Sequence, residues 1–262
     1  MDLRLQGKTA LVTGASRGIG LATAIALAAE GVTVVGASRT VSDELRDADV
    51  TVITTDLSEA DAPARLVSQA IEALGGRLDI VVNNAGGGDD VTVGGLLSYD
   101  EDFWQRIFDL NFYSAVRICR AAIPALLETG GSVVNVSSMG AKIPGTPGTP
   151  VPYATAKAAL NAFGKSLSEE YGPQGISVRT VSPGPTLTSI WDADKYGGGV
   201  AASAGVEHSD LMKNLPALSG MTTGRFVTAE EVGAFITYLV SPLGESIVGS
   251  DHLIEGGAIK TV

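Results

Sequence analysis

The sequence predicts an α/β protein built on a parallel β-sheet, and two observations support this prediction. Short apolar or β-branched segments alternate with longer Ala- and Leu-rich segments along almost all of the 262 residues, as strands alternate with crossover helices. Glycine-rich or polar turns follow several of the short segments at their carboxyl ends, where ligands bind in open α/β sheets. Because one rhythm runs throughout, with no linker or tandem repeat, we expect a single domain over residues 1–262.

The predicted elements alternate regularly in chain order. Strands are expected at residues 9–13, 32–37, 50–54, 78–82, 132–136 and 177–181 and around 252–254. Helices are expected at residues 21–30, 60–74, 103–127, 154–171 and 229–239. Prolines at positions 144, 147, 150 and 152 make the segment before Tyr153 non-helical, which places Tyr153 at the start of its helix.

A glycine-rich turn joins the first strand to the first helix. It reads Gly14-Ala15-Ser16-Arg17-Gly18-Ile19-Gly20, and its glycines permit a tight turn and a close backbone approach. The free amides and the dipole of the following helix N-terminus suit a pyrophosphate. The spacing differs from the common dinucleotide fingerprint, so a plain glycine turn remains an equal alternative for this loop taken alone.

The tip of the second strand indicates which dinucleotide is preferred. An Asp or Glu at this point would bind the ribose hydroxyls of NAD, but Ser38 and Arg39 stand here, and Arg17 projects from the glycine loop. Two guanidinium groups can bind a 2′-phosphate. The sequence therefore favours NADP over NAD. The alternative is that both arginines are solvated surface charges.

Tyr153 and Lys157 are the candidate centre of the chemistry. Four residues apart on a helix, they lie on one face. A neighbouring cation favours the phenolate and lowers a tyrosine pKa that is ordinarily about 10, which would suit Tyr153 for general acid–base catalysis. Taken alone, the spacing is more typical of a surface lysine and a packed tyrosine one turn apart.

The regular rhythm stops between residues 189 and 225. Gly197-Gly198-Gly199 and scattered apolar side chains such as Trp191 and Tyr196 replace it. Long segments without regular structure are usually functional or disordered, so we expect a mobile substrate lid; the alternative is an insertion with one helix. With the glycine-rich rim at 87–95 and the loop at 139–152, it would line a pocket for a modest, fairly apolar carbonyl compound. These segments do not distinguish a steroid, a sugar-derived ketone, a quinone or an acyl-thioester.

Composition excludes several other classes of function. A net charge of −11 without any Lys/Arg cluster argues against nucleic-acid binding. Cys119 is the only cysteine and sits in an apolar run, so we expect a small buried hydrophobe, with no disulfide and no thiolate metal site. His208 and His252 are isolated, which argues against a metal centre or a catalytic triad. No signal core or membrane span is evident, and we expect a cytoplasmic protein.

Six motifs in order resemble those of the short-chain dehydrogenase/reductase family. They are Thr13-Gly14-x-x-x-Gly18-x-Gly20, Asn83-Asn84-Ala85-Gly86, Asn111, Ser138, Tyr153-x-x-x-Lys157 and Pro183-Gly184. The resemblance covers nearly the whole chain. It implies a Rossmann-type doubly wound sheet of about seven parallel strands, with helices on both faces.

The same resemblance implies a role for each catalytic residue. Tyr153 would exchange a proton with the carbonyl or alcohol oxygen, and Lys157 would hold the nicotinamide ribose and keep the Tyr153 pKa low. Ser138 would bind the substrate oxygen, and Asn111 would hold a water that passes protons to Lys157. Ser138 is preferred to Ser137 because the second serine of such a pair is the family's usual catalytic one. The interval from Ser138 to Tyr153 is slightly longer than is usual in the family.

The resemblance also implies the residues that would bind NADP(H). Asp56 would meet the adenine, and Thr186 and Thr188 the nicotinamide amide. The full set is Gly14, Ser16, Arg17, Gly18, Ile19, Gly20, Ser38, Arg39, Asp56, Leu57, Asn83, Ala85, Gly86, Tyr153, Lys157, Pro183, Gly184, Thr186 and Thr188.

The leading hypothesis is an NADP(H)-dependent oxidoreductase that interconverts a ketone and a secondary alcohol and works as a carbonyl reductase. An NAD-dependent alcohol dehydrogenase is the first alternative. A dinucleotide-binding regulator without turnover is a second, although it would not need the proton-relay residues. The resemblance further implies a homotetramer or homodimer built on the long helices at 103–127 and 154–171.

Overall fold

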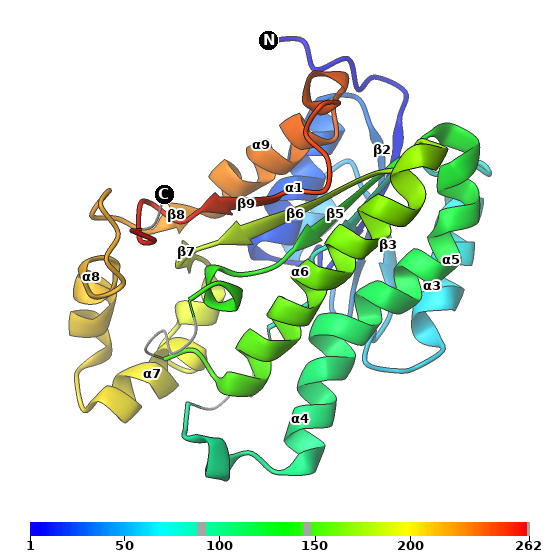
Figure 1. Ribbon diagram of the computed structural model, residues 1–262. Helices are drawn as coiled ribbons and strands as arrows, with labels where there is room; N and C mark the ends of the chain where they lie inside the picture. Colours follow the sequence, from blue (N-terminus) through cyan, green and yellow to red (C-terminus); the bar gives the residue numbers. More distant parts are fainter. Residues whose placement is uncertain (88–92, 144–147, 261–262) are drawn as a thin grey trace.

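A computed structural model describes residues 1–87, 93–143 and 148–260 (Figure 1). Its main sheet has seven strands in the order β3-β2-β1-β4-β5-β6-β9, and neighbouring strands are parallel. The strands are β1 (Thr9–Thr13), β2 (Thr33–Ser38), β3 (Thr51–Thr54), β4 (Ile80–Asn83), β5 (Ser132–Val136), β6 (Ser177–Pro183) and β9 (Asp251–Ile254). The strand order reverses between β1 and β4, where open α/β sheets bind ligands. The predicted doubly wound sheet is confirmed.

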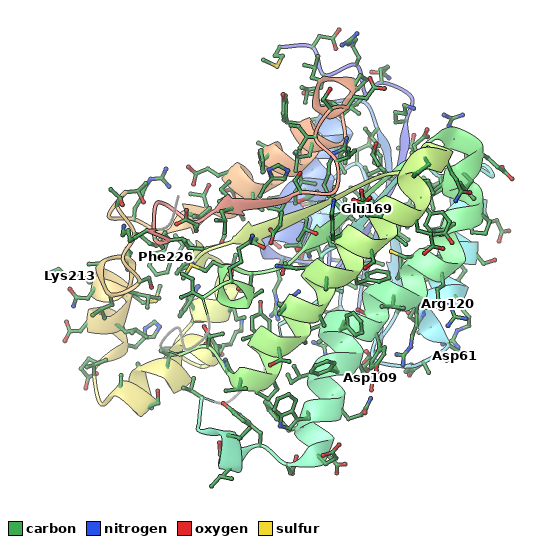
Figure 2. All side chains as sticks on the ribbon, viewed as in Figure 1. Asp61, Asp109, Arg120, Glu169, Lys213 and Phe226 are labelled. Carbon is green, nitrogen blue, oxygen red and sulfur yellow. The ribbon has the colours of Figure 1, made fainter. Side chains whose placement is uncertain are left out.

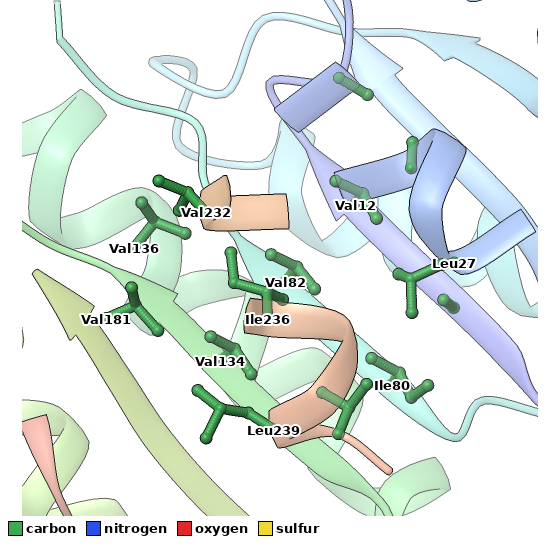
Figure 3. Packing of buried hydrophobic residues seen from close by; sticks show 14 of the residues in the cluster. Val12, Leu27, Ile80, Val82, Val134, Val136, Val181, Val232, Ile236 and Leu239 are labelled. Carbon is green, nitrogen blue, oxygen red and sulfur yellow. The ribbon is translucent and has the colours of Figure 1, made fainter. Parts of the chain in front are cut away.

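Helices cover both faces of the sheet (Figure 1). On one face α1 (Gly18–Ala29) packs beside α9 (Ala229–Leu239); on the other lie α3 (Ala62–Ala73), α5 (Ser114–Thr129) and α6 (Val151–Tyr171). Every residue of β1 is buried because both of its faces are covered. Figure 3 shows the α1/α9 core, which includes Val12, Leu27, Ile80, Val82, Val134, Val181, Val232, Ile236 and Leu239.

The helix expected at 103–127 is interrupted. It consists of α4 (Glu101–Phe108), a π-helical turn η2 (Asp109–Tyr113) and α5. Asn111 lies inside this turn, and its Nδ2 donates to the backbone oxygen of Ile107 at 3.0 Å. A side-chain hydrogen bond to the carbonyl of the preceding turn takes the place of a regular backbone hydrogen bond. π-Helical turns of this kind often occur at functional sites. Apolar periodicity alone does not reveal this interruption.

The region from 189 to 225 is more regular than expected. It contains α7 (Tyr196–Ala204) and α8 (His208–Leu218), and its ends are held together by β7 (Thr186–Leu187) and β8 (Val227–Thr228), which pair as a two-stranded sheet. The expectation of a segment without regular structure was therefore wrong. The small residues of α7 do not show the apolar periodicity that predicts a helix. In the structure, its glycines allow close packing.

Smaller differences concern helix ends and loop positions. Helix α6 begins at Val151, so Pro152 occupies the first turn, where a missing amide costs nothing. A short helix, α2 (Asp43–Asp47), was not predicted. Gly88, Asp89 and Asp90 of the expected rim, and prolines 144 and 147 of the expected loop, lie outside the described residues.

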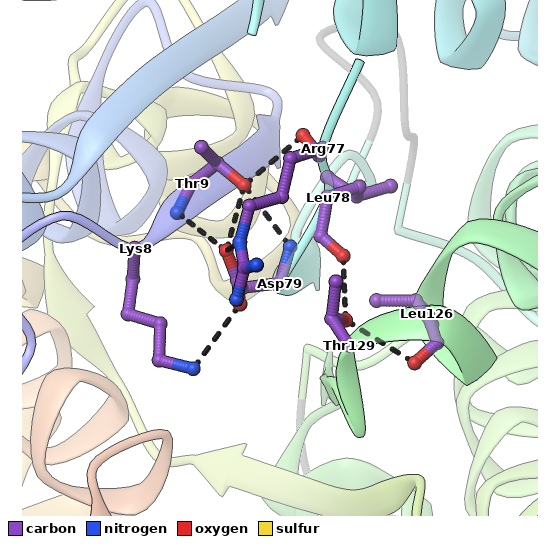
Figure 4. Close-up of polar contacts among 7 residues, drawn as sticks. All are labelled: Lys8, Thr9, Arg77, Leu78, Asp79, Leu126 and Thr129. Atoms are coloured by element: carbon purple, nitrogen blue, oxygen red, sulfur yellow. Dashed lines mark hydrogen bonds and ion pairs between the residues drawn. The ribbon is translucent and has the colours of Figure 1, made fainter. Parts of the chain in front are cut away.

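Hydrogen bonds to the buried Asp79 connect the start of β1 with the residues just before β4, at the end of the sheet opposite the expected ligand site (Figure 4). Asp79 is 2% exposed; it accepts hydrogen bonds from Arg77 Nε at 2.8 Å, Lys8 Nζ at 3.1 Å and the Thr9 amide at 3.0 Å. Burial alone would raise the pKa of Asp79, but the hydrogen bonds from Arg77, Lys8 and Thr9 lower it to about 2.

We expect Asp79→Asn to reduce the free energy of unfolding by about 2 kcal/mol at pH 7. The folded pKa lies below the unfolded value of about 3.9, so the carboxylate stabilises the fold fully above that value. This contribution is lost as the pH falls toward about 2. Urea unfolding at pH 7 and pH 3 should show the difference between wild type and variant shrinking at the lower pH. Asp43→Asn, at an exposed ion pair with Arg46, serves as the control and should leave stability unchanged; an equal loss at both pH values would contradict the account.

Candidate active site

A cavity of about 450 Å³ lies at the carboxyl ends of the central strands. It runs from the tip of β2 past the glycine loop to the start of α6 and the region that follows β7. Most of the predicted site residues line it: Gly14, Ser16, Arg17, Gly18, Ile19, Ser38, Arg39, Asp56, Leu57, Ala85, Gly86, Ser138, Tyr153, Lys157, Pro183, Gly184, Thr186 and Thr188.

The glycine loop depends on two left-handed residues and one close approach. Gly14 and Gly18 have φ of +67° and +55°, a region that favours glycine. A Cβ on Gly20 would overlap the Gly14 carbonyl and the amide of Asn84. Asn84 Nδ2 donates to the carbonyls of Thr13 and Gly14 at 3.0 and 3.1 Å. The lack of a side chain at Gly20 therefore lets the start of α1 pack closely against the loop. Helix α1 begins at the cavity, where its free amides suit a pyrophosphate.

Two arginines and a serine from the glycine loop and the tip of β2 line the cavity. They are Arg17, Ser38 and Arg39. Asp56 lies close by: burial would raise its pKa, but hydrogen bonds from Ser58 and the charge of Arg39 lower it. A cavity that joins two guanidinium groups to a glycine-lined helix N-terminus fits a phosphorylated dinucleotide.

Ser138, and not Ser137, contacts the tyrosine. The Ser138 hydroxyl is hydrogen-bonded to the Tyr153 phenol. Ser137 Oγ instead donates to the backbone oxygen of Lys157 at 3.2 Å. Lys157 Nζ donates to the Val136 carbonyl at 2.9 Å and lies 5.8 Å from the centre of the Tyr153 ring. The end of β5 and the first turns of α6 thus bring three functional groups to one wall.

The pKa of Tyr153 is raised, whereas Lys157 was expected from the sequence to lower it. Burial raises it, and the hydrogen bond from Ser138 only partly offsets this effect. Burial also lowers the pKa of Lys157 to about 8. The lysine is itself desolvated by burial, and burial of the phenol has the larger effect on the pKa of Tyr153. Tyr153 is therefore protonated at neutral pH, as a proton donor requires.

Asn111 lies behind this wall. It is 1% exposed; its Oδ1 accepts from the Gly87 amide at 2.8 Å, and its Nδ2 donates to the Gly87 carbonyl at 3.0 Å. A Cβ on Gly86 would lie 2.9 Å from both Asn111 Oδ1 and Lys157 Nζ. The absence of a side chain at Gly86 lets these two residues approach the same stretch of backbone.

We expect Gly86→Ala to lower catalytic efficiency by about tenfold or more, because the added methyl group must displace Asn111 or Lys157, and small misplacements are costly in an active site. Gly95→Ala is the matched control, since a Cβ there meets no atom within 4 Å in the part of the chain that the structure describes. Steady-state kinetics on both purified variants would check this. Full activity of Gly86→Ala would show that the close approach is unimportant.

Asn83 does not reach the cavity, although it was assigned to the cofactor set. It is 4% exposed, and its Nδ2 donates to Asn135 Oδ1 at 2.9 Å and Cys119 Sγ at 3.3 Å. Its neighbour Asn84 lines the cavity instead, since successive side chains of a strand point to opposite faces. Cys119 is fully buried, as expected, and burial raises its pKa to about 12.

The side chains at the far end of the cavity belong to segments that were expected to line a pocket, but none of them was among the predicted site residues. They come from the loop before α6 and from the region between β7 and β8. They include Thr149, Pro150, Ile190, Trp191, Tyr196, Val200, Leu215 and Ser219. The predicted lid thus does line the cavity, and scattered aromatic residues within it were the available signal.

Two features are absent from the part of the chain that is described. Within it, no helix combines the length and apolar character that crossing a bilayer requires. Nor do three or more His, Cys, Asp or Glu side chains come together there as a metal site.

Comparison with known proteins agrees with this geometry. A family model described as enoyl-(acyl carrier protein) reductase matches residues 14–258. The chain is 33% identical to the short-chain reductase protein NovJ of Streptomyces niveus, over 96% of this chain and 94% of that protein. It is 32% identical to 2-keto-3-deoxy-L-fuconate dehydrogenase of Xanthomonas campestris pv. campestris, over 98% and 81%.

A solved structure is similar over its full length. L-sorbose reductase from Gluconobacter frateurii, complexed with NADPH and L-sorbose, is 28% identical with a TM-score of 0.88, and the match covers 100% of both chains. The sheet, the glycine loop and the Ser138–Tyr153–Lys157 wall lie within these matches. The chain belongs to the short-chain dehydrogenase/reductase family of oxidoreductases.

Proposed function

We propose that this protein transfers hydride between NADP(H) and a ketone or secondary alcohol, and that it works as a carbonyl reductase. One observation carries the proposal. The Tyr153 phenol, the Ser138 hydroxyl and the buried Lys157 amine share a cavity whose other end holds the glycine loop and two arginines. Such a cavity accommodates a dinucleotide and a small carbonyl compound side by side.

The residues on this wall have distinct tasks. Tyr153, protonated at neutral pH, donates its proton to the carbonyl oxygen, and Ser138 donates a second hydrogen bond to the same atom. Lys157 binds the nicotinamide ribose, and Asn111 fixes the Gly87 backbone beside it. The bound cofactor supplies the hydride.

The preference for NADP(H) rests on charge. Arg17 of the glycine loop and Arg39 after β2 both line the cavity, and the tip of β2 carries Ser38 in place of a carboxylate. The sorbose reductase similar to this chain was solved with NADPH. An NAD-dependent alcohol dehydrogenase remains the competing function, and it requires both arginines to be incidental to cofactor binding.

A titration with NADPH and with NADH, followed by nicotinamide fluorescence, tests the cofactor preference. Tighter binding of NADPH supports the proposal; tighter binding of NADH would replace it with the competing function. Reduction of simple ketones and of an α,β-unsaturated ketone, whose products distinguish C=O from C=C reduction, then tests the reaction. Binding without turnover of any carbonyl compound would favour a regulator.

We also propose that the whole chain acts as one domain, with residues 189–225 as its lid.

We further propose that α4, η2 and α6 form a contact between identical subunits. Four partly exposed aromatic rings follow one another there: Trp104 to Phe108 at 6.1 Å, Phe108 to Phe112 at 6.2 Å and Phe112 to Phe163 at 6.2 Å. A continuous aromatic surface of this kind marks interaction sites. Figure 2 labels Asp109, which lies in η2 on this side of the molecule.

We expect Phe112→Glu to lower the mass measured by light scattering from that of a dimer or tetramer toward that of a smaller species, because a charge placed in an apolar contact lacks a partner. Leu218→Glu is the control: this side chain is 72% exposed, on α8. A wild-type mass equal to one chain would refute the contact.

A further inference from the structure

The far end of the cavity has an uncharged, mostly apolar wall. Met139 lies on the side of β5, and Ile190, Trp191, Tyr196, Val200 and Leu215 face it from the lid. Among the described residues at this end, the polar side chains are hydroxyl groups, and the Tyr196 hydroxyl already donates to the Gly148 carbonyl. A charged or polyhydroxylated substrate would lose hydration here without gaining enough partners.

Trp191 is held firmly within this wall. Its Nε1 donates to the Thr186 carbonyl at 3.0 Å, and its backbone oxygen lies 2.6 Å from His208 Nε2. Its ring meets Tyr196 edge-on at 5.5 Å and Phe226 at 5.9 Å. Figure 2 labels Phe226, which lies just before β8, where the lid returns to the sheet. Because its polar edge is satisfied, the indole offers the cavity an apolar surface.

The glycines at the start of α7 explain how Trp191 is placed. A Cβ on Gly197 would overlap the Trp191 carbonyl, and one on Gly198 would overlap that of Ala193. A Cβ on Gly199 would meet no atom of the described residues within 4 Å. These residues are therefore not merely flexible: Gly197 and Gly198 allow α7 to pack directly against the segment that carries Trp191.

Building on the proposed function, we propose that the substrate is a neutral ketone with a flat, apolar ring system, which packs against Trp191 and Tyr196. Gly197 is a positioning residue that sets this preference through Trp191. Aromatic side chains bury large apolar areas and favour offset or edge-to-face contact with other rings. Such a pocket discriminates between substrates by the ring area it covers and by the hydroxyl groups it leaves without partners.

Kinetics with four ketones and NADPH test the substrate class. We expect kcat/KM for 2-tetralone to exceed that for L-sorbose and pyruvate by about a hundredfold or more, with 2-butanone in between. A preference for sorbose or pyruvate would overturn the inference and leave the proposed function intact. If no ketone is reduced, the proposed function fails, and binding decides the inference. By calorimetry, 2-naphthol should bind and D-sorbitol should not; absence of 2-naphthol binding would overturn it.

Matched variants test the role of Gly197. Gly197→Ala should lower kcat/KM for 2-tetralone by about tenfold and leave 2-butanone nearly unchanged, whereas Gly199→Ala should change neither. Trp191→Leu should give the same selective loss, and it keeps the test available if Gly197→Ala fails to fold. Equal losses for both ketones would indicate a general structural defect and overturn the positioning role.

Discussion

Replacing Tyr153 by phenylalanine is expected to lower ketone turnover by about 10²- to 10⁴-fold, the range typical of a lost general acid. The ring and its packing remain, and only the hydroxyl that bonds to Ser138 is removed. The cofactor end of the cavity is unchanged, so the Kd for NADPH should stay within about twofold of wild type, because no charged contact is lost. Single-turnover kinetics and fluorescence titration measure the two quantities separately.

Tyr238→Phe provides the control for this variant. Tyr238 lies on α9 and donates a hydrogen bond to Leu243, away from the cavity wall. Its loss should leave turnover unchanged. Full activity of Tyr153→Phe would show that another group delivers the proton.

Replacing Arg17 and Arg39 together by alanine should weaken NADPH binding by about a hundredfold or more, since each charge-assisted hydrogen bond contributes about 1.5–3 kcal/mol. NADH lacks the 2′-phosphate, so its Kd should change little. The two titrations should therefore converge in the variant. Arg46→Ala removes an exposed arginine that pairs with Asp43 on α2 and should affect neither cofactor. Retained NADPH preference in the double variant would place the phosphate elsewhere.

The sheet and the order of the site residues were predictable because each depends on local sequence. Buried parallel strands read as short apolar runs, and β1 and β5 begin and end at the predicted residues. Ligands at the carboxyl ends of such strands follow from the fold class. Tyr153 and Lys157 share a face because they are one helical turn apart.

The remaining features depend on contacts that are distant in sequence. Asn83 and Asn84 look equivalent in the sequence, but the pleat of β4 directs the first into the sheet. Asn111 interrupts a helix by bonding to Ile107 and Gly87. The pKa of Tyr153 is set by how deeply the folded chain buries it. Periodicity contains no information about any of these contacts.

The helices of the region from 189 to 225 were also not predictable from the sequence alone. Glycines normally weaken helix predictions, yet Gly197 lies in α7 because the helix packs against Trp191. Only the three-dimensional structure shows that a Cβ on this glycine would overlap the backbone of Trp191. The pairing of β7 with β8 likewise joins residues some forty positions apart.

The most direct test of the central claim is the transfer of isotope from cofactor to product. NADPH carrying deuterium at both C4 positions would be incubated with the protein and 2-tetralone or another ketone that it reduces, and the alcohol analysed by mass spectrometry. We expect one deuterium on the carbinol carbon, with turnover strongly reduced in Tyr153→Phe. An alcohol without deuterium, or label transferred at an undiminished rate by Tyr153→Phe, would contradict the proposed hydride and proton transfer at this site.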